Sequence, residues 1–407
     1  MVMLFLLFII LMRLLFAYQS YEEFISKPFY YTEATVLHSY EKSKGNRRYQ
    51  VLKLRSEEGL NFYTTSYAQD DRIHKRLRLQ LFPSEKITFF GYLGTFYVKS
   101  KIKEQQPLAP TLKDTLLEKV AMQHTEPLLH SFYNAIFFAT PLDKALREKI
   151  SLLGVSHLVA LSGFHLGILW GLVYGVLLLL YKPFQQRYFP YRHALFDVGL
   201  VAMISLGLYV WFVDFPPSLV RSYTMVLVGW TVLLLGMELL SFTFLATIIL
   251  LLLALFPSLL VSLGFWLSVA GVFYIFLLLQ YTKEMKVWVI SLVIIPLGIF
   301  LLMLPVVHSV FPVTSGYQLL SPLLSLLFVP FYPLAMLLHL FGFGHLFDTV
   351  LLVLFNMPQE SRDSLLPLWA LVVYVSVSIG AIWSKRLFWL VLGLASLYMI
   401  DLFIFVQ

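Results

Sequence analysis

The chain has 407 residues, of which 59% are hydrophobic, only 13% are charged and none is cysteine. A water-soluble globular domain carries about 25% charged residues, so the composition excludes that class and indicates a protein that crosses a membrane many times. Without cysteine, a disulfide framework and a thiolate metal site are excluded as well.

The first element is an apolar segment, residues 1–20, which has neither a basic region before it nor a small-residue cleavage site. We expect it to stay in place as an N-terminal transmembrane anchor. Residues 28–103 then alternate β-branched and aromatic runs with polar turns, which predicts a small all-β domain of about five strands, OB-like in type. EKITFFGYLG (85–94) is one of the predicted strands, and DDRIHKRLRLQ (70–80) is one of the predicted connections.

The same small domain carries the net charge of +7, because residues 28–103 hold 14 Lys/Arg against 7 Asp/Glu and the rest of the chain is balanced. Aromatic side chains lie between the basic ones, a combination that single-strand binders use to stack bases and contact phosphates. A solvated surface beside anionic lipid headgroups would explain the charge equally well. The candidate DNA-binding residues are Arg47, Arg48, Lys53, Arg55, Arg72, Lys75, Arg76 and Arg78.

Residues 108–153 show the mixed charge pattern of amphipathic helices, which we expect at the membrane interface or against the β domain. Residues 155–407 contain ten apolar segments, so the anchor brings the total to about eleven. The ten segments are about 155–181, 193–213, 217–237, 240–257, 262–281, 287–304, 318–340, 343–356, 363–383 and 386–406. The predicted fold class is therefore a polytopic α-helical membrane protein with a small N-terminal all-β soluble domain. Basic loops at 182–193, 281–286 and 384–386 indicate the cytoplasmic side, which places the β domain and the C-terminus outside the cytoplasm.

Most of the candidate functional residues of the membrane region lie in one apolar stretch, GVSHLVALSGFHLGILWGLVYG (154–175). It is predicted to be the first long helix of the membrane region and contains His157, Ser162 and His165. Polar side chains at membrane depth are costly and usually face a bundle interior or a watery path. Glycines repeat every four residues and form one helix face that a second helix can approach closely. These candidate helix-packing glycines are Gly163, Gly167, Gly171 and Gly175.

Several roles remain open for these side chains. Ser162 and His165 are three residues apart and can meet on one helix face, as a nucleophile with its base, as a polar conduit lining or as ordinary interhelical hydrogen-bond partners. Arg221 either forms a structural pair, reaches the membrane surface or contacts a substrate. His345 and Asp348 have the spacing of a pair or of interfacial residues. HEXXH and HXHXDH motifs are absent, so no metal site is expected.

Three stretches resemble one family. HLVALSGFHLGIL resembles the central signature of the ComEC-type competence proteins, with Gly154, His157, Ser162 and His165 in register. PPSLVRSYTM is similar to the family's proline-rich turn and its intramembrane arginine, which is Arg221 here. FPSLLVSLGFWLSVAGV is similar to a third motif of the family. The matching residues of that motif include Gly264, Phe265, Leu267 and Ser268.

The resemblance implies a multi-pass channel in a bacterial cytoplasmic membrane that passes single-stranded DNA during natural transformation, with no enzymatic activity and no cofactor. His157, Ser162, His165 and Arg221 would line its path. Its implied partners are single-stranded DNA, membrane lipid, an external DNA receptor and a cytosolic helicase-type motor or recombination proteins. An intramembrane serine hydrolase and a small-molecule or lipid transporter are the alternative functions.

The chain also departs from the family pattern. Many members continue into a metallo-β-lactamase-like domain, and no His/Asp metal cluster follows here, so we expect a separate nuclease if one strand is degraded. Trp266 stands where the family often has glutamine. Ser321 and Pro322 stand where it has an Asn-Leu pair, so no role is carried over to that position.

Overall fold

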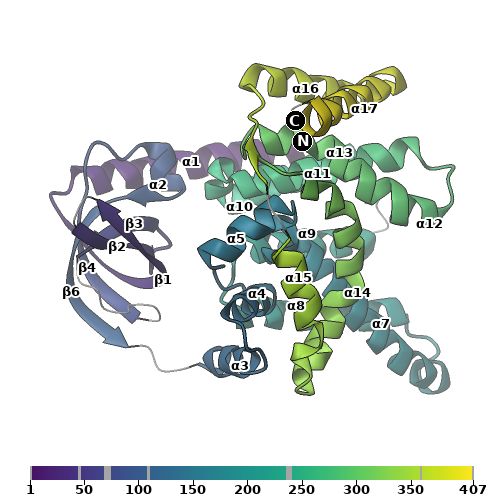
Figure 1. Ribbon diagram of the computed structural model, residues 1–407, viewed down its shortest axis with the longest axis horizontal. Helices are drawn as coiled ribbons and strands as arrows, with labels where there is room; N and C mark the ends of the chain where they lie inside the picture. Colours follow the sequence, from purple (N-terminus) through teal and green to yellow (C-terminus); the bar gives the residue numbers. More distant parts are fainter. Residues whose placement is uncertain are drawn as a thin grey trace. The chain divides into compact units, whose positions relative to one another are not determined.

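The computed structural model describes residues 2–44, 47–67, 75–107, 111–234, 241–357 and 360–405. Within these residues, strands occupy the N-terminal quarter and helices most of the remainder (Figure 1). The chain divides into two compact units. Met1–Thr111 with Ala246–Phe265 forms the first, and Leu112–Leu245 with Trp266–Gln407 forms the second.

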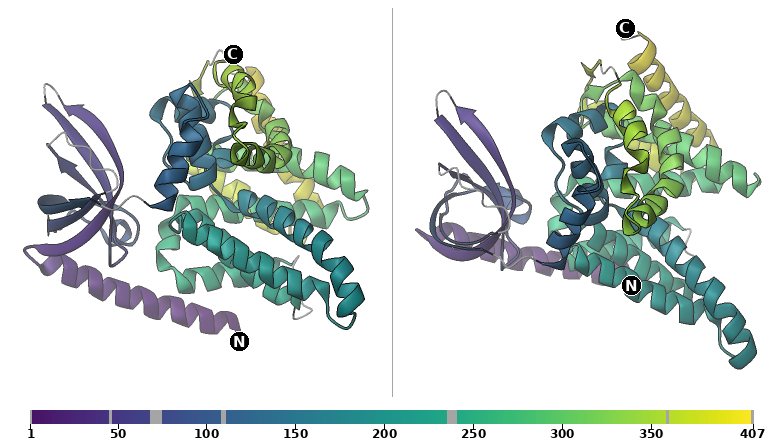
Figure 2. Two further views of the ribbon diagram at one scale, coloured as in Figure 1. Left: turned by 90° about the horizontal axis from the view of Figure 1, so that it is seen from below. Right: turned by 60° about the horizontal axis from the view of Figure 1, so that its bottom comes forward.

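The first unit starts with helix α1 (Val2–Ser26) and continues into a six-stranded sheet. The strands are β1 (Tyr30–Lys44), β2 (Arg47–Ser56), β3 (Asn61–Ser66), β4 (Lys75–Phe82), β5 (Phe96–Tyr97) and β6 (Lys99–Pro107). Their order is β5-β3-β2-β1-β4-β6. Only Val98 separates β5 from β6, yet β5 pairs with β3 and β6 with β4 at opposite edges. The sheet therefore curls towards a barrel, as Figure 2 shows.

Alternation along the strands builds the core of this barrel, because successive side chains of a strand point to opposite faces. Leu52 and Leu54 of β2 are fully buried, and so is Phe62 of β3. Lys53 and Arg55 alternate with these leucines, and so they lie on the outer face. The basic residues of β2 are consequently kept out of the core by the same pattern that fills it.

Two local predictions for this domain were wrong. EKITFFGYLG (85–94) contains helix α2 (Phe89–Leu93) instead of a strand, because the Thr88 hydroxyl accepts a hydrogen bond from Gly91 N and caps a helical turn. DDRIHKRLRLQ (70–80) contains the start of β4 instead of a connection. Its leucines alternate with basic residues, and Leu77 and Leu79 are fully buried.

The second unit begins with three helices, α3 (Leu112–Ala121), α4 (Pro127–Phe138) and α5 (Lys144–Leu152). Residues 108–153 were expected at an interface, and α4 does not fit that expectation. Most of its side chains are buried, including Tyr133. An apolar helix without a polar face is stable only when it is surrounded, so α4 lies inside the helical unit.

The later helices match the predicted apolar segments closely. They are α6 (Ser156–Val159), α7 (Gly163–Tyr188), α8 (Ala194–Phe212), α9 (Pro217–Leu234), α10 (Phe242–Leu255), α11 (Leu263–Tyr281), α12 (Val287–Val289), α13 (Ile295–His308), α14 (Ser321–Leu340), α15 (Asp348–Phe355), α16 (Leu368–Gly380) and α17 (Lys385–Ile400). Short one-turn helices extend or join several of them: η1 (Pro257–Val261), η2 (Ile290–Ile294), η3 (Gly316–Leu320), η4 (Gly344–Phe347) and η5 (Asp401–Phe405). Strand β7 (Val313–Thr314) pairs with β8 (Arg362–Asp363).

Seven helices in the described part of the chain are long and apolar enough to cross a membrane. They are Met3–Ser26, Gly163–Tyr188, Ala194–Phe212, Leu263–Tyr281, Val287–His308, Gly316–Leu340 and Lys385–Ile404. Three shorter apolar helices, Phe242–Leu255, Gly344–Phe355 and Leu368–Gly380, accompany them. The chain is thus a helical protein with several candidate membrane spans and an N-terminal β-sheet domain.

The helical unit has two buried clusters. The larger one joins α4 and α5 to residues 153–169 and to side chains of α8, α9, α14 and α15. Tyr133 of α4 and Tyr332 of α14 lie at its centre and are fully buried. The second cluster joins α11, α13, α16 and α17 around Tyr274 and Tyr374. The larger cluster holds the start of α7, where the chemistry predicted from the sequence is concentrated.

Candidate functional site

Ser162 and His165 meet at the first turn of α7. Ser162 is the N-cap of this helix, and its hydroxyl accepts a hydrogen bond from Phe164 N at 3.3 Å. In return, Ser162 N–H donates to His165 Nδ1 at 3.3 Å. The two residues therefore form a capping box, which satisfies helix N–H groups that have no partner inside the helix.

This arrangement corrects the prediction of one continuous helix from residue 155. α7 starts at Gly163, and Ala160 and Ser162 have extended backbone conformations. The polar residues consequently sit at the head of the helix and not in its middle. Their position follows from the capping preference of serine, which favours a helix start over a helix interior.

The capping geometry does not favour a nucleophile and base pair. Ser162 Oγ lies 3.3 Å from His165 Nδ1, but that nitrogen already accepts from Ser162 N–H. The other ring nitrogen, His165 Nε2, is buried and has no hydrogen-bond partner among the described residues. A catalytic base is normally oriented by a third group, and no side chain of the described residues does this for His165 Nε2.

Hydrogen bonds connect the short helix α6 to α14, and connect Leu161, in the loop between α6 and α7, to α9. Ser325 Oγ donates to Ser321 O at 2.7 Å, so it accepts from His157 Nε2 at 3.2 Å. Ser218 Oγ donates to Leu161 O at 2.6 Å. Residues 156–162 are therefore held between two long helices by polar contacts, and His157 remains exposed beside Ser325.

Gly154 has a local structural reason to be glycine. Its φ of +68° lies in the left-handed region, which a side chain disfavours. A Cβ at this position would also lie 3.2 Å from Gln318. Ser321 Oγ donates to Gly154 O at 3.1 Å, so the turn before α6 packs directly on the segment that leads into α14.

The predicted glycine face of α7 packs closely at one position only. A Cβ on Gly163 would lie 2.8 Å from Ser222 Oγ, so α9 approaches α7 there. By contrast, a Cβ on Gly167, Gly171 or Gly175 would have no neighbour within 4 Å among the described residues. These three glycines therefore face open space in the described part of the chain, and their helix-packing role stays a prediction.

That open space is a groove of about 580 Å³ between α7 and α14. It is lined by Gly163, Phe164, Gly167, Ile168, Gly171, Leu172, Val329 and Pro333. Phe164 is exposed, and its ring stacks against Phe328 of α14 with centroids 6.2 Å apart. The groove is lined from Gly163, next to the capping box, to Leu172, so the start of α7 forms one end of an open, apolar surface.

The other predicted site residues lie on neighbouring elements. Arg221 is half-buried on α9, one turn after Ser218. The third family motif covers η1 and the start of α11, where Phe265 is buried while Gly264 and Ser268 are exposed. The structure thus brings His157, Ser162 and His165 together at the head of α7, and it places the third motif on a separate helix start.

A buried network between distant segments was not predicted. His124, in the loop between α3 and α4, lies with Nδ1 2.9 Å from Asp348 Oδ1 and with Nε2 2.9 Å from His339 Nε2. Its ring stacks on Tyr133 at 4.4 Å. Burial lowers the pKa of His124 and favours the neutral imidazole.

Of the two possibilities left open for His345 and Asp348, their pairing with each other is therefore wrong. Asp348 contacts His124, and His345 is exposed. The spacing of three residues suggested His345 as the partner of Asp348, but the partner in the structure is His124, which is 224 positions away in the sequence. The signal in the sequence was weak, since a histidine in a polar loop before an apolar helix has many possible partners.

The candidate DNA-binding residues of the β domain differ in their surroundings. Arg76 forms ion pairs with Glu33 and Glu57, and Arg78 lies 3.5 Å from Glu104. These pairs offset the positive charge of β4. Lys53 lies over the ring of Tyr63, 6.0 Å from its centroid. Arg72 lies outside the described residues.

The remaining basic residues of β2 include Arg48 and Arg55, which are exposed and have no ion-pair partner in the described part of the chain. Arg47 starts β2, and Lys75 starts β4. The positive charge that no ion pair offsets is therefore concentrated on β2 and is not spread over all of the candidate DNA-binding residues.

Comparison with known proteins bears on the helical unit and the signature segment within it. Among curated proteins and among solved structures, none matches the chain. The family model described as Competence protein matches residues 139–403, a stretch that starts at the end of α4 and includes the signature, the groove and α9 to α17. Since this match covers more than half of the 407 residues, the chain belongs to the Competence protein family.

Proposed function

We propose that the protein is a channel that passes single-stranded DNA across the bacterial cytoplasmic membrane during natural transformation. Membership of the Competence protein family supports a role in DNA uptake. The observation that carries the finer proposal is the open groove on α7, which starts at the family signature and has room where helix packing was expected.

The groove has the properties that bases require of a path. Its glycines expose a smooth surface without side chains, and Phe164 offers a ring at its head. Bases stack on aromatic rings with little sequence preference, as a conduit for any DNA requires. His157, Ser325 and Ser162 place hydrogen-bonding groups at the same end. Weak contacts at several successive points allow binding and release along a path.

The N-terminal β domain would capture the strand before it reaches the groove. Its closure through Val98 supports an OB-like barrel, a fold whose second and third strands commonly form the nucleic-acid face. Here one outer face carries Lys53 and Arg55 of β2 together with Tyr63 of β3, which is directly paired with Lys53 across the two strands. This face combines positive charge with an aromatic ring, so we assign the first contact with DNA to it.

The topology follows from charge and apolar segments together. Seven candidate spans, three shorter apolar helices and α9 give the eleven segments of this proposal. With the basic loop at 182–193 in the cytoplasm, the barrel, the signature and the C-terminus lie outside. An external DNA receptor, a cytosolic motor or recombination proteins, and a separate nuclease complete the proposed system.

Filling the groove tests this function. We expect Gly171→Leu to reduce transfer of fluorescent DNA into the cytoplasm to the level of a strain without the gene, with DNA held outside the inner membrane. A Cβ at Gly171 meets no atom within 4 Å, so the variant should fold. Gly393→Leu is the matched control, because Gly393 on α17 is equally open and does not line the groove.

Two outcomes count against the proposal. Normal cytoplasmic DNA in cells without the protein would reject the channel. Normal uptake by Gly171→Leu would remove the groove from the path. The hydrolase alternative has a separate readout: a serine-directed fluorophosphonate that labels the wild type but not Ser162→Ala would revive it, and the capping geometry predicts no labelling.

A further inference from the structure

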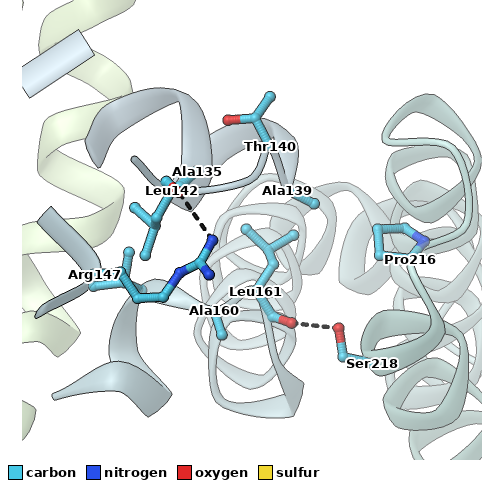
Figure 3. A pocket seen from close by; sticks show the side chains of 10 residues that line it. Ala135, Ala139, Thr140, Leu142, Arg147, Ala160, Leu161, Pro216 and Ser218 are labelled. Atoms are coloured by element: carbon cyan, nitrogen blue, oxygen red, sulfur yellow. Dashed lines mark hydrogen bonds between the residues drawn. The ribbon is translucent and has the colours of Figure 1, made fainter. Parts of the chain in front are cut away.

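A second cavity, of about 250 Å³, is lined in part by residues of the signature segment. Its walls come from the end of α4, from α5, from Val159 to Leu161 of the signature and from the start of α9 (Figure 3). The volume is many times the ~10–15 Å³ that a single water needs. The lining is mostly small or apolar, and Arg147 of α5 supplies its one charged side chain.

Arg147 points its guanidinium into this space, as Figure 3 shows. One nitrogen, Nη2, donates to Leu142 O at 3.0 Å, which fixes the side chain and leaves most of its N–H groups available. No carboxylate pairs with it among the described residues. Glu148, the next residue, pairs with Lys144 at 3.8 Å, and Asp214, near the wall formed by Pro216, pairs with Lys113 at 2.6 Å. Asp143, one turn before Arg147, has no ion-pair partner in the described part of the chain.

Thr140 and the start of α9 also contribute to the same space. The Thr140 hydroxyl lines the cavity and has no hydrogen-bond partner in the described part of the chain. The Ser218 hydroxyl already donates to Leu161 O at 2.6 Å, so the contribution of α9 is the positive end of its helix dipole, which adds to the potential of Arg147.

The backbone around the cavity is strained. In the described residues, three non-glycine residues have positive φ: Ala139 (+59°), Asp214 (+66°) and Phe215 (+51°). Ala139 lines the cavity, and the other two directly precede Pro216, which lines it from the opposite wall. Strained backbone persists where the surrounding structure holds it, often at binding sites.

We infer that this cavity is a phosphate-binding site, with Arg147 as its principal ligand, and that it receives the backbone of the DNA strand on its way to the signature segment. A planar guanidinium suits phosphate because two of its N–H groups reach two oxygens at once. The inference rests on the proposed function. The site lies at the end of α7 opposite to the basic loop 182–193, so it belongs to the side from which the strand arrives.

The test uses the full chain in nanodiscs of zwitterionic lipid and a fluorescent oligo-dT. Arg147→Gln should weaken binding about tenfold, as expected for the loss of one charge-assisted contact. It should also lower the slope of log affinity against log salt by about 0.7, since one phosphate contact is lost on a single strand. Arg147→Lys should restore part of the affinity, because it keeps the charge but loses the two-oxygen contact.

Lys144→Gln is the matched control. It removes the same charge from the same helix, but Lys144 does not line the cavity. Its salt slope should equal that of the wild type. Arg147 is exposed, so the thermal midpoints of all variants should agree and exclude misfolding.

The outcomes separate this site from the channel itself. If the wild type conducts and binds DNA while Arg147→Gln matches it in affinity and salt slope, the phosphate site is wrong and the channel stands. If Arg147→Gln instead loses only bound anionic lipid in native mass spectrometry, the phosphate belongs to a headgroup, and the DNA assignment is overturned. If the wild type neither binds oligo-dT nor conducts DNA, the proposed function fails first.

Discussion

The buried network of His124, His339 and Asp348 allows a prediction that follows from counting hydrogens. His339 Nδ1 lies 2.7 Å from Ala335 O, and a carbonyl only accepts, so this nitrogen carries a hydrogen. In the neutral ring, His339 Nε2 is then an acceptor, and His124 Nε2–H donates to it at 2.9 Å. His124 Nδ1 is left facing both oxygens of Asp348 at 2.9 Å.

That last contact needs one more hydrogen. A neutral imidazole nitrogen and an ionised carboxylate are both acceptors, so the pair is complementary only when it holds a shared proton. Asparagine would supply a permanent N–H donor of nearly the same shape. We therefore expect Asp348→Asn to keep the contact and to change the free energy of unfolding by less than about 1 kcal/mol.

Asp348→Ala should behave differently, because it leaves His124 Nδ1 without a partner in a buried site. An unsatisfied buried polar group costs about 1–3 kcal/mol. At roughly 2 °C per kcal/mol for a unit of this size, the thermal midpoint should fall by about 2–6 °C. His124→Phe should cost at least as much, since it keeps the ring on Tyr133 but removes the partner of the Asp348 carboxylate and of His339 Nε2.

The assay is thermal unfolding of the purified protein in one detergent, followed by tryptophan fluorescence at one scan rate. Glu148→Ala, an exposed acid, is the control for loss of a carboxylate and should leave the midpoint unchanged. Equal destabilisation by Asp348→Asn and Asp348→Ala would refute the hydrogen count. It would mean that the site requires the charge of the carboxylate and not merely a donor.

Two further predictions concern the signature segment. Gly154→Ala should destabilise the protein by about 1–2 kcal/mol or more, because φ is +68° and a Cβ would meet Gln318 at 3.2 Å; an unchanged unfolding midpoint would contradict this. Ser162→Ala should cost about 1 kcal/mol through loss of the N-cap, while Ser162→Thr should retain most of it. If alanine and threonine give the same midpoint, Ser162 does not act as a cap.

Much of the architecture could be predicted from the sequence, because the apolar composition and periodicity of a segment indicate whether it is removed from water. Each predicted apolar segment of the membrane region contains a helix in the structure, and most of the predicted strands of the β domain are present. The exceptions involve local competition. The aromatic run at α2 predicted a strand, but the Thr88 cap favours a helical turn. In β4, the many arginines and lysines suggested a connection, although the leucines between them alternate and are buried as in a strand.

The candidate site was only partly predictable. The sequence by itself determined that His157, Ser162 and His165 cluster in one short stretch, because they are close along the chain. Only the tertiary structure decided that Ser162 starts a helix, that Gly167 and Gly171 face an open groove, and that His124 reaches Asp348. These features depend on which surfaces meet across long sequence separations, and helical periodicity specifies a face of a helix but not its neighbour.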